Sequence, residues 1–243
     1  MSKRWDNLSK MWSEKGTVAT AKFIGSRVGH LATSGRLSPS NTISANRDLW
    51  SRYDWSANGE EWTNSPEFKT GIIDNILLPN VPPGSRVLEI GPGAGRWTEV
   101  ILRQAKYLTV VDLTPECIRL CRERFAAFQN VSYFVNDGKD LSFVLPASID
   151  RIWSFDVFVH IQASDVQDYV RQFATVLTPG GRGIIHHSAK GVSEKLWRSD
   201  MTTERMAEFC GQYGLRVVEQ RSAWADFKIN QEDRDVVTIF ERP

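Results

Sequence analysis

Long apolar runs are missing from this sequence. No stretch approaches the roughly 20 consecutive apolar residues that a membrane-spanning helix needs. The first residues, Met1 to Asp6, include two basic side chains, and no apolar stretch follows them, so we expect no signal peptide. The sequence therefore predicts a cytoplasmic protein without a membrane span.

Cysteine is also scarce, with three residues in 243. Cys117, Cys121 and Cys210 show no C-x-x-C spacing, which argues against a disulfide framework or a zinc site. The formal net charge of +1 gives no general attraction for nucleic acid or an anionic membrane. With 41% hydrophobic and 24% charged residues, the composition is that of a globular domain.

Acidic residues are rare at the start of the chain. Residues 1–47 contain eight lysines or arginines but only Asp6 and Glu14 as acids, and residues 32–41 are rich in turn formers. We predict an N-terminal basic arm and linker over residues 1–47, partly helical between Val18 and Val28, and a catalytic domain over residues 48–243. A lid or the contact of a homo-oligomer is the favoured role of this arm; binding to an anionic partner such as RNA is the alternative.

A glycine-rich turn organises the rest of the chain. Val87–Ile90 is predicted to be a buried strand, and Gly91, Gly93 and Gly95 follow it before a helix begins. Glycines suit a loop whose backbone turns tightly and approaches a ligand closely. Their spacing is G-x-G-x-G, and Arg96 stands where the dinucleotide-binding pattern needs its third glycine. A nicotinamide or flavin dinucleotide is therefore disfavoured.

Strands and helices alternate on both sides of this motif. We predict further strands over residues 107–111, 131–135, 149–155 and 182–187, and a final pair over 215–221 and 235–240. Helices are predicted over 65–78, 96–102, 115–128, 166–177 and 203–213. The fold class is α/β: a Rossmann-like, doubly wound, seven-stranded sheet with an antiparallel last strand, plus the N-terminal helical arm.

Ligands of such sheets bind at the carboxyl ends of the strands. Asp112 ends the second predicted strand, where a carboxylate can accept hydrogen bonds from two ribose hydroxyls. Asp137 follows the third strand and could accept from the exocyclic amine of adenine; a plain Asp-Gly turn is the alternative.

These motifs resemble those of class I S-adenosylmethionine (SAM) methyltransferases. The resemblance rests on V-L-E-I-G-P-G-A-G at 87–95, V-V-D at 110–112, N-D-G at 136–138, I-D-R-I-W-S-F-D at 149–156 and L-T-P-G-G at 177–181. It implies SAM as cofactor, with the glycine loop around its amino-acid part and Glu89 orienting either the loop or the SAM amino group. The implied cofactor-binding residues are Glu89, Gly91, Gly93, Gly95, Trp97, Asp112, Leu113, Asp137, Gly138 and Phe155.

A narrower likeness concerns the methyl acceptor. Y-D-W and G-E-E-W within 53–62, S-F-D-V-F-V-H at 154–160 and H-H-S at 186–188 resemble bacterial methyltransferases of glycans or secondary metabolites. Tyr53, Trp62 and His186 are therefore expected to contact a small-molecule or glycan acceptor. Aromatic rings suit stacking on a sugar, although core packing explains them as well.

A hydroxyl acceptor needs a base, and three histidines follow two neighbouring strands. His160 is the first choice as base and His187 or His186 the second, with Asp156 as an orienting or substrate-binding residue. We expect these side chains to meet at one rim of the site; ordinary packed histidines are the alternative. Adjacent histidines in a strand point to opposite faces and the set is poor in carboxylates, so no metal is predicted.

The sequence thus predicts an O-methyltransferase that acts on a hydroxyl of a sugar or glycosylated small molecule. N-methylation of a small amine or peptide and a non-catalytic SAM-binding scaffold are the alternatives. Methylation of nucleic-acid bases is disfavoured, because Ser154-Phe155-Asp156-Val157 stands where an N-P-P-Y or D-P-P-Y motif is expected. The acceptor, the methylated position and the oligomeric state do not follow from the sequence.

Overall fold

The computed structural model describes residues 41–63, 65–191, 198–224, 227–229 and 234–243. These residues belong to one compact unit, Asn41–Pro243. The predicted helix at Val18–Val28 lies outside the described residues. The predicted boundary between residues 47 and 48 falls inside the first described helix, α2 (Ile43–Ser51). No helix in the described ranges is long and apolar enough to cross a membrane.

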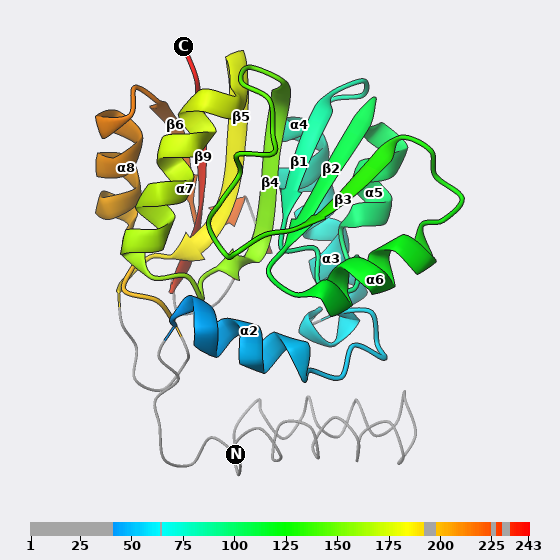
Figure 1. The fold of residues 1–243 in the computed structure, drawn as a ribbon. Helices are drawn as coiled ribbons and strands as arrows, with labels where there is room; N and C mark the ends of the chain where they lie inside the picture. The colour runs from blue at the N-terminus through cyan, green and yellow to red at the C-terminus, as the bar shows by residue number, and fades with distance from the viewer. Residues whose placement is uncertain (1–40, 64, 192–197, 225–226, 230–233) are drawn as a thin grey trace, which may run out of the picture. The chain divides into compact units, whose positions relative to one another are not determined.

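A seven-stranded mixed sheet forms the centre of this unit (Figure 1). Its order is β3 (Val131–Val135), β2 (Tyr107–Asp112), β1 (Arg86–Ile90), β4 (Ile149–Phe158), β5 (Leu177–Ser188), β9 (Asp235–Glu241) and β6 (Arg216–Arg221). The first five strands pair in parallel, and β9 is antiparallel to both of its neighbours. The predicted doubly wound sheet with an antiparallel last strand is confirmed.

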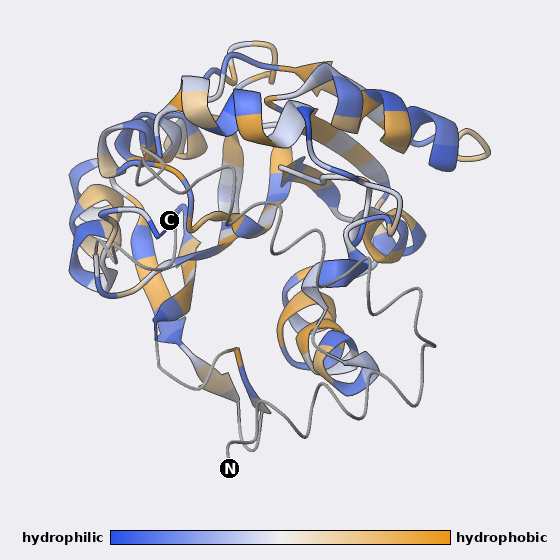
Figure 2. Ribbon diagram, turned by 90° about the horizontal axis from the view of Figure 1, so that it is seen from below, coloured by the Kyte–Doolittle hydropathy of each residue, from blue (hydrophilic) through white to orange (hydrophobic). Residues whose placement is uncertain are grey.

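Helices cover both faces of the sheet. One face carries α3 (Pro66–Ile72), η2 (Ile73–Leu77), α4 (Leu78–Asn80), α5 (Thr98–Gln104) and α6 (Pro115–Arg124); the other carries α7 (Ala163–Val176) and α8 (Thr203–Gln212). Because successive strand residues point to opposite faces, Ile184 and Ile185 of β5 belong to different core clusters. Figure 2 shows the helices divided into orange apolar and blue polar sides, as expected for packing against a sheet.

Capping residues mark the starts of two helices. Ser65 accepts a hydrogen bond from the Phe68 backbone N–H at 3.1 Å, and Pro66 occupies the first turn. Thr114 and Pro115 begin α6 in the same way. These local rules set the entry of both helices, and the buried apolar side of each then packs on the sheet.

Three details differ from the expectation. The strand β5 begins at Leu177, so Thr178-Pro179-Gly180-Gly181 is part of its paired start; Gly180 N–H donates to Arg242 O at 2.7 Å. The strand β4 extends past residue 155 to Phe158, with a register shift against β5. A short helix η1 (Glu60–Trp62) and a hairpin of β7 (Ala223–Trp224) and β8 (Phe227–Lys228) lacked a clear sequence pattern.

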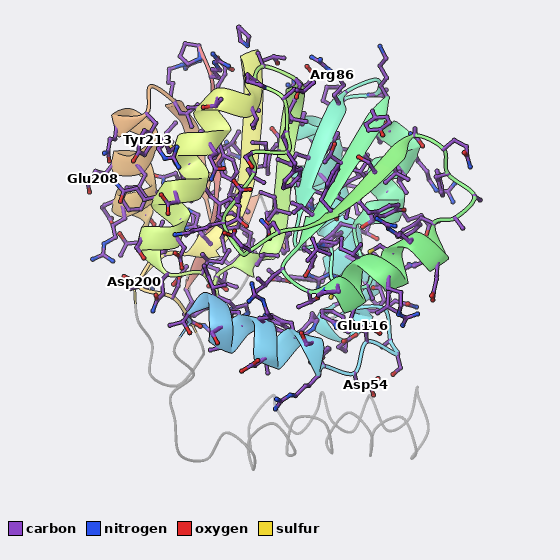
Figure 3. The ribbon with its side chains drawn as sticks, in the orientation of Figure 1. Asp54, Arg86, Glu116, Asp200, Glu208 and Tyr213 are labelled. Carbon is purple, nitrogen blue, oxygen red and sulfur yellow. The ribbon has the colours of Figure 1, made fainter. Side chains whose placement is uncertain are left out.

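The amino and carboxyl ends of the parallel strands lie at opposite edges. Arg86, labelled at the top of Figure 3, begins β1 and pairs with Asp150 of β4 at 2.8 Å. The helix α2 runs across the lower edge, beneath the carboxyl ends (Figure 1). Strand order reverses between β1 and β4, so the carboxyl ends of these two strands are where a ligand is expected.

Candidate active site

A pocket lies at this point of the sheet. It is bounded by residues that follow β1, β2, β3 and β4, by the first turns of α7 and by α2. Its lining includes Asn46, Trp50, Gly91, Asp112, Leu113, Asn136, Gly138, Asp156, Val157, His160, Asp165 and Tyr169.

The glycine loop forms the wall next to β1. Gly91 has a φ of +70°, and a Cβ added there would lie 2.4 Å from the Val157 side chain. Gly93 has a φ of +57°, and its added Cβ would lie 2.7 Å from the Trp55 ring. Both positions therefore need glycine for conformation and for close packing. The segment before α3 thus covers the loop through Trp55.

Asp112 ends β2 and is 8% exposed. Its Oδ1 accepts hydrogen bonds from the Thr114 backbone N–H at 2.8 Å and from the Thr114 hydroxyl at 3.0 Å. Burial raises the pKa of Asp112 to about 6, and the Thr114 hydrogen bonds offset part of that effect. The carboxylate is thus held in a defined orientation inside the pocket.

Glu89 lies on β1 behind the glycine loop and is 1% exposed. Burial raises the pKa of its carboxyl group to about 8, which the nearby Thr98 hydroxyl offsets only in part. Among the described residues, no donor forms a hydrogen bond of ordinary geometry with either Glu89 oxygen. The Glu89 carboxyl group therefore has hydrogen-bonding capacity left for an added group.

The turn after β3 places its residues differently from the prediction. The Asp137 side chain is exposed and does not line the pocket; its Oδ1 accepts from the Lys139 and Asp140 backbone N–H groups at 3.0 and 2.8 Å. Asn136 and Gly138 line the pocket instead, and Asn136 Nδ2 donates to the Tyr169 hydroxyl at 3.0 Å. The Asp-Gly turn reading therefore describes the Asp137 carboxylate better than the adenine-binding role.

His160 follows β4 and lines the pocket. Its backbone O accepts from Asn46 Nδ2 at 2.7 Å, and its ring centroid lies 5.6 Å from that of Trp50. The expectation of three histidines at one rim is wrong, because neither His186 nor His187 reaches the pocket.

His186 and His187 are instead packed inside the sheet. His187 is fully buried, with Nε2 2.7 Å from Thr238 Oγ1 and Nδ1 2.8 Å from Ser188 O. Burial lowers the pKa of His187 to about 4. His186 is 1% exposed and stacks on Phe155 with centroids 4.2 Å apart. These surroundings remove His187 as a base and His186 as a direct acceptor contact.

Asp156 links the pocket to a buried ion pair. It has a φ of +63°, which is uncommon for a residue other than glycine, and its carboxylate pairs with Arg96. Its Oδ1 lies 3.1 Å from His186 Nδ1. Burial raises its pKa, but Arg96 and His186 outweigh that effect and hold the pKa well below the usual range. The Asp156 carboxylate is therefore ionised, and it orients its neighbours rather than accepting a proton.

The charged side chains in the pocket wall are mainly acidic. Asp112, Asp156 and Asp165 line it, and no lysine or arginine of the described ranges does so. Acidic walls concentrate cationic ligands and disfavour phosphates and carboxylates.

Comparisons with known proteins agree with this geometry. Residues 87–181 match the family model described as a methyltransferase domain. The chain is 32% identical over 110 residues to the ubiquinone biosynthesis O-methyltransferase of Xanthomonas campestris pv. campestris strain B100, and the match covers 45% of this chain and 45% of that protein. It is 33% identical over 105 residues to the demethylmenaquinone methyltransferase of Tropheryma whipplei strain Twist, covering 43% and 42%.

Residues 87–181 thus match a methyltransferase domain, and the strand order is that of the Rossmann-like methyltransferase fold. The chain spans less than half the length of these curated relatives. The crystal structure of the N-methyltransferase NodS from Bradyrhizobium japonicum WM9 in complex with S-adenosylhomocysteine (SAH) shares the fold, with a TM-score of 0.59 and 18% identity over 85% of this chain and 100% of that one.

The pocket fits SAM in charge. SAM carries a sulfonium and an ammonium group, and both suit a wall that contains Asp112, Asp156 and Asp165. Of the residues that the sequence predicts to bind the ribose and adenine of SAM, Asp112, Leu113 and Gly138 line the pocket. When bound, SAM supplies a methyl group activated by the positive sulfur.

The remaining predicted residues lie around this pocket. Trp97 and Phe155 are buried in the core behind the methyltransferase loop, with ring centroids 5.5 Å apart. Tyr53 and Trp62 stack on each other at 5.8 Å in an aromatic cluster with Trp50 and do not line the pocket. Gly95 packs beside Phe125, outside the pocket lining.

Sequence reasoning missed the residues that α2 and α7 contribute. Asn46 and Trp50 come from α2, Val157 from the end of β4, and Asp165 and Tyr169 from α7. Tyr169 is 2% exposed, as its place on the apolar side of α7 requires, and it also lines the pocket, where its hydroxyl accepts from Asn136 Nδ2. Helical periodicity does not distinguish such a residue from core.

Proposed function

We propose that this methyltransferase domain transfers the methyl group of SAM to a hydroxyl of a small acceptor, a sugar or glycosylated small molecule, with His160 as general base. One observation carries the proposal: of the histidines in the described part of the chain, His160 alone lines the pocket that also contains Asp112 and Gly91. A neutral imidazole within reach of the hydroxyl can accept its proton as the new bond forms. The O-methyltransferase activity named for the Xanthomonas relative supports the hydroxyl acceptor.

The test is a rate comparison on a fixed panel of probes: methyl glycosides, catechol and ethanolamine, with SAH release as the readout. We expect methylation of a hydroxyl probe, and a loss of about 10²-fold or more in kcat for His160→Gln with SAH affinity retained. Full activity of His160→Gln would remove its role as base. His187→Gln is the matched control in the core, and its kcat is expected to stay close to that of the wild type in folded protein.

The acidic pocket wall favours a second candidate, N-methylation of a small amine. An amine is cationic before it reacts, and Asp165, on the first turn of α7, could attract it. The same panel decides between the two: methylation of ethanolamine alone, unaffected by His160→Gln and weakened by Asp165→Asn, would establish the amine acceptor.

A further inference from the structure

We infer that Asn46 and Trp50 of α2 are positioning residues that hold His160 in place for proton transfer. The inference rests on the proposed function, in which His160 is the base. It concerns two residues that lie 114 and 110 positions away from His160 in the sequence and meet it only in the fold.

The two contacts restrain different parts of His160. Asn46 Nδ2 donates to the His160 carbonyl oxygen at 2.7 Å and so holds the backbone. The Trp50 ring lies 5.6 Å from the imidazole at an interplanar angle of 58° and so limits ring rotation. All three side chains line the pocket, so this restraint acts where the acceptor must bind.

His160 needs such a restraint because the strand has already ended. The pairing of β4 with β5 reaches Phe158, and α7 begins at Ala163. In the turn between them, the His160 backbone N–H donates to Val157 O at 2.9 Å. The carbonyl oxygen of the same residue accepts from Asn46, so α2 also supports the turn.

The helix α2 contacts the pocket through two separate groups of side chains. It has no fully buried residue, so it is not a core element. One group, Asn46 and Trp50, contacts His160; the other contacts the turn after β3, where Arg47 Nη2 donates to Asp137 O at 3.2 Å. Asn46 and Trp50 therefore position the base, whereas Arg47 attaches the helix near the adenine side. The two functions can be changed separately.

Trp50 also connects His160 to the glycine loop. Trp55 Nε1 donates to Trp50 O at 3.2 Å, and the Trp55 ring packs on Gly93. The restraint on His160 thus extends to the loop expected to hold the amino-acid part of SAM. Because Trp50 and Trp55 link His160 to the glycine loop, we expect His160 to be in position whenever that loop has its cofactor-binding conformation.

The experiment compares Asn46→Ala with Arg47→Ala in the full chain, with SAH as the bound probe. The first readout is the His160 imidazole cross-peak in a ¹H–¹³C NMR spectrum of the SAH complex, assigned by its loss in His160→Gln. We expect Asn46→Ala to move or broaden this cross-peak and Arg47→Ala to leave it in place. Calorimetry should show a similar loss of SAH affinity for both, about three- to tenfold, since each loses one hydrogen bond.

The second readout is kcat at saturating SAM on the hydroxyl probe that the panel identifies. Asn46→Ala and Trp50→Leu should lower kcat about tenfold or more, since misplacement of about 1 Å is enough for such losses. Trp50→Phe, which keeps a ring against His160, should restore most of it. Asp48→Ala, exposed on the same helix, serves as the unaffected control.

Two outcomes would overturn the inference, and they differ from failure of the proposed function. The first is a His160 cross-peak that does not move in Asn46→Ala. The second is a kcat of Asn46→Ala and Trp50→Leu equal to that of Asp48→Ala, while His160→Gln is inactive. Either result would show that α2 merely covers the cofactor. Retained activity of His160→Gln would instead remove the base itself.

Discussion

At the scale of single residues, the site depends on carboxyl groups that differ in protonation. Glu89 is buried without an ordinary hydrogen bond, whereas Asp156 is paired with Arg96. Burial raises the pKa of the first to about 8, and Arg96 with His186 keeps that of the second low. The pocket therefore combines a neutral acid behind the loop with an ionised one at its rim.

This difference predicts a pH dependence of stability. The unfolded chain releases the Glu89 proton near pH 4.5, whereas the folded chain keeps it until about pH 8, so the free energy of unfolding falls as pH rises through that window. Glu89→Gln lacks this titration. Its stability relative to the wild type should therefore rise between pH 5 and 8, by up to about 1.4 kcal/mol per pH unit.

Urea unfolding of the apo protein at several pH values measures the effect. Glu99→Gln is the control, because the Glu99 side chain is 44% exposed and Arg103 lowers its pKa, so it stays ionised across the window. Parallel pH curves for the wild type and Glu89→Gln would contradict a buried neutral Glu89.

The Arg96–Asp156 pair predicts strong coupling between two residues 60 positions apart. Removing one partner leaves a buried charge, so Arg96→Met and Asp156→Asn should each lower the free energy of unfolding by about 2 kcal/mol. This figure allows for the 33% exposure of the Asp156 side chain, which lets water reduce the cost. Asparagine tolerates a positive φ, so Asp156→Asn tests charge rather than backbone strain.

A double-mutant cycle by urea unfolding measures the coupling. The double variant should lose clearly less than the sum of the two single losses, because no unpaired charge remains. Strict additivity would show that the two side chains do not interact in the folded protein.

At the scale of elements, one helix start serves both stability and the site. Thr114 caps α6 by accepting from the Cys117 backbone N–H, and its hydroxyl also donates to Asp112. Thr114→Ala should therefore lower the free energy of unfolding by about 1 to 2 kcal/mol and weaken SAH binding several-fold.

The matched control is another threonine cap. Thr202 begins α8 by accepting from the Arg205 backbone N–H at 3.2 Å, far along the sheet from Asp112. Thr202→Ala should cost a similar free energy in thermal or urea unfolding without changing SAH affinity in calorimetry. Equal SAH binding by Thr114→Ala and Thr202→Ala would contradict the role of Thr114 in orienting Asp112.

Elements whose signals are local could be predicted from the sequence. The order of strands and helices, and from it the sheet, follows from local patterns. Examples are the cap Ser65-Pro66, the apolar run of β1 and the apolar side of α7. The start of β5 was missed, because Pro and Gly at 178–181 indicate a turn although the backbone pairs there. This segment is a strand because it pairs with residues that are distant in the sequence, and a local pattern does not show such pairing.

At the scale of the whole molecule, the sequence predicts the edge of the sheet that forms the site but not every side chain that faces it. Asp112 follows from its strand end alone, and it lines the pocket. His186 and His187 do not reach the pocket, because β5 lies inside the sheet between β4 and β9 and both side chains are buried there. Contributions from α2 depended on how that helix packs across the sheet, which no periodicity encodes.

The central claim is that the pocket at the carboxyl ends of β1 and β4 binds SAM through Asp112. The most direct measurement is calorimetric titration of the purified protein with SAH, with the wild type beside Asp112→Ala and with Asp150→Ala at the opposite edge of the sheet as control. Loss of two charged hydrogen bonds should weaken SAH binding in Asp112→Ala by at least about 30-fold, while Asp150→Ala binds like the wild type. Equal binding by Asp112→Ala and the wild type, or no binding of SAH by either, would contradict the account.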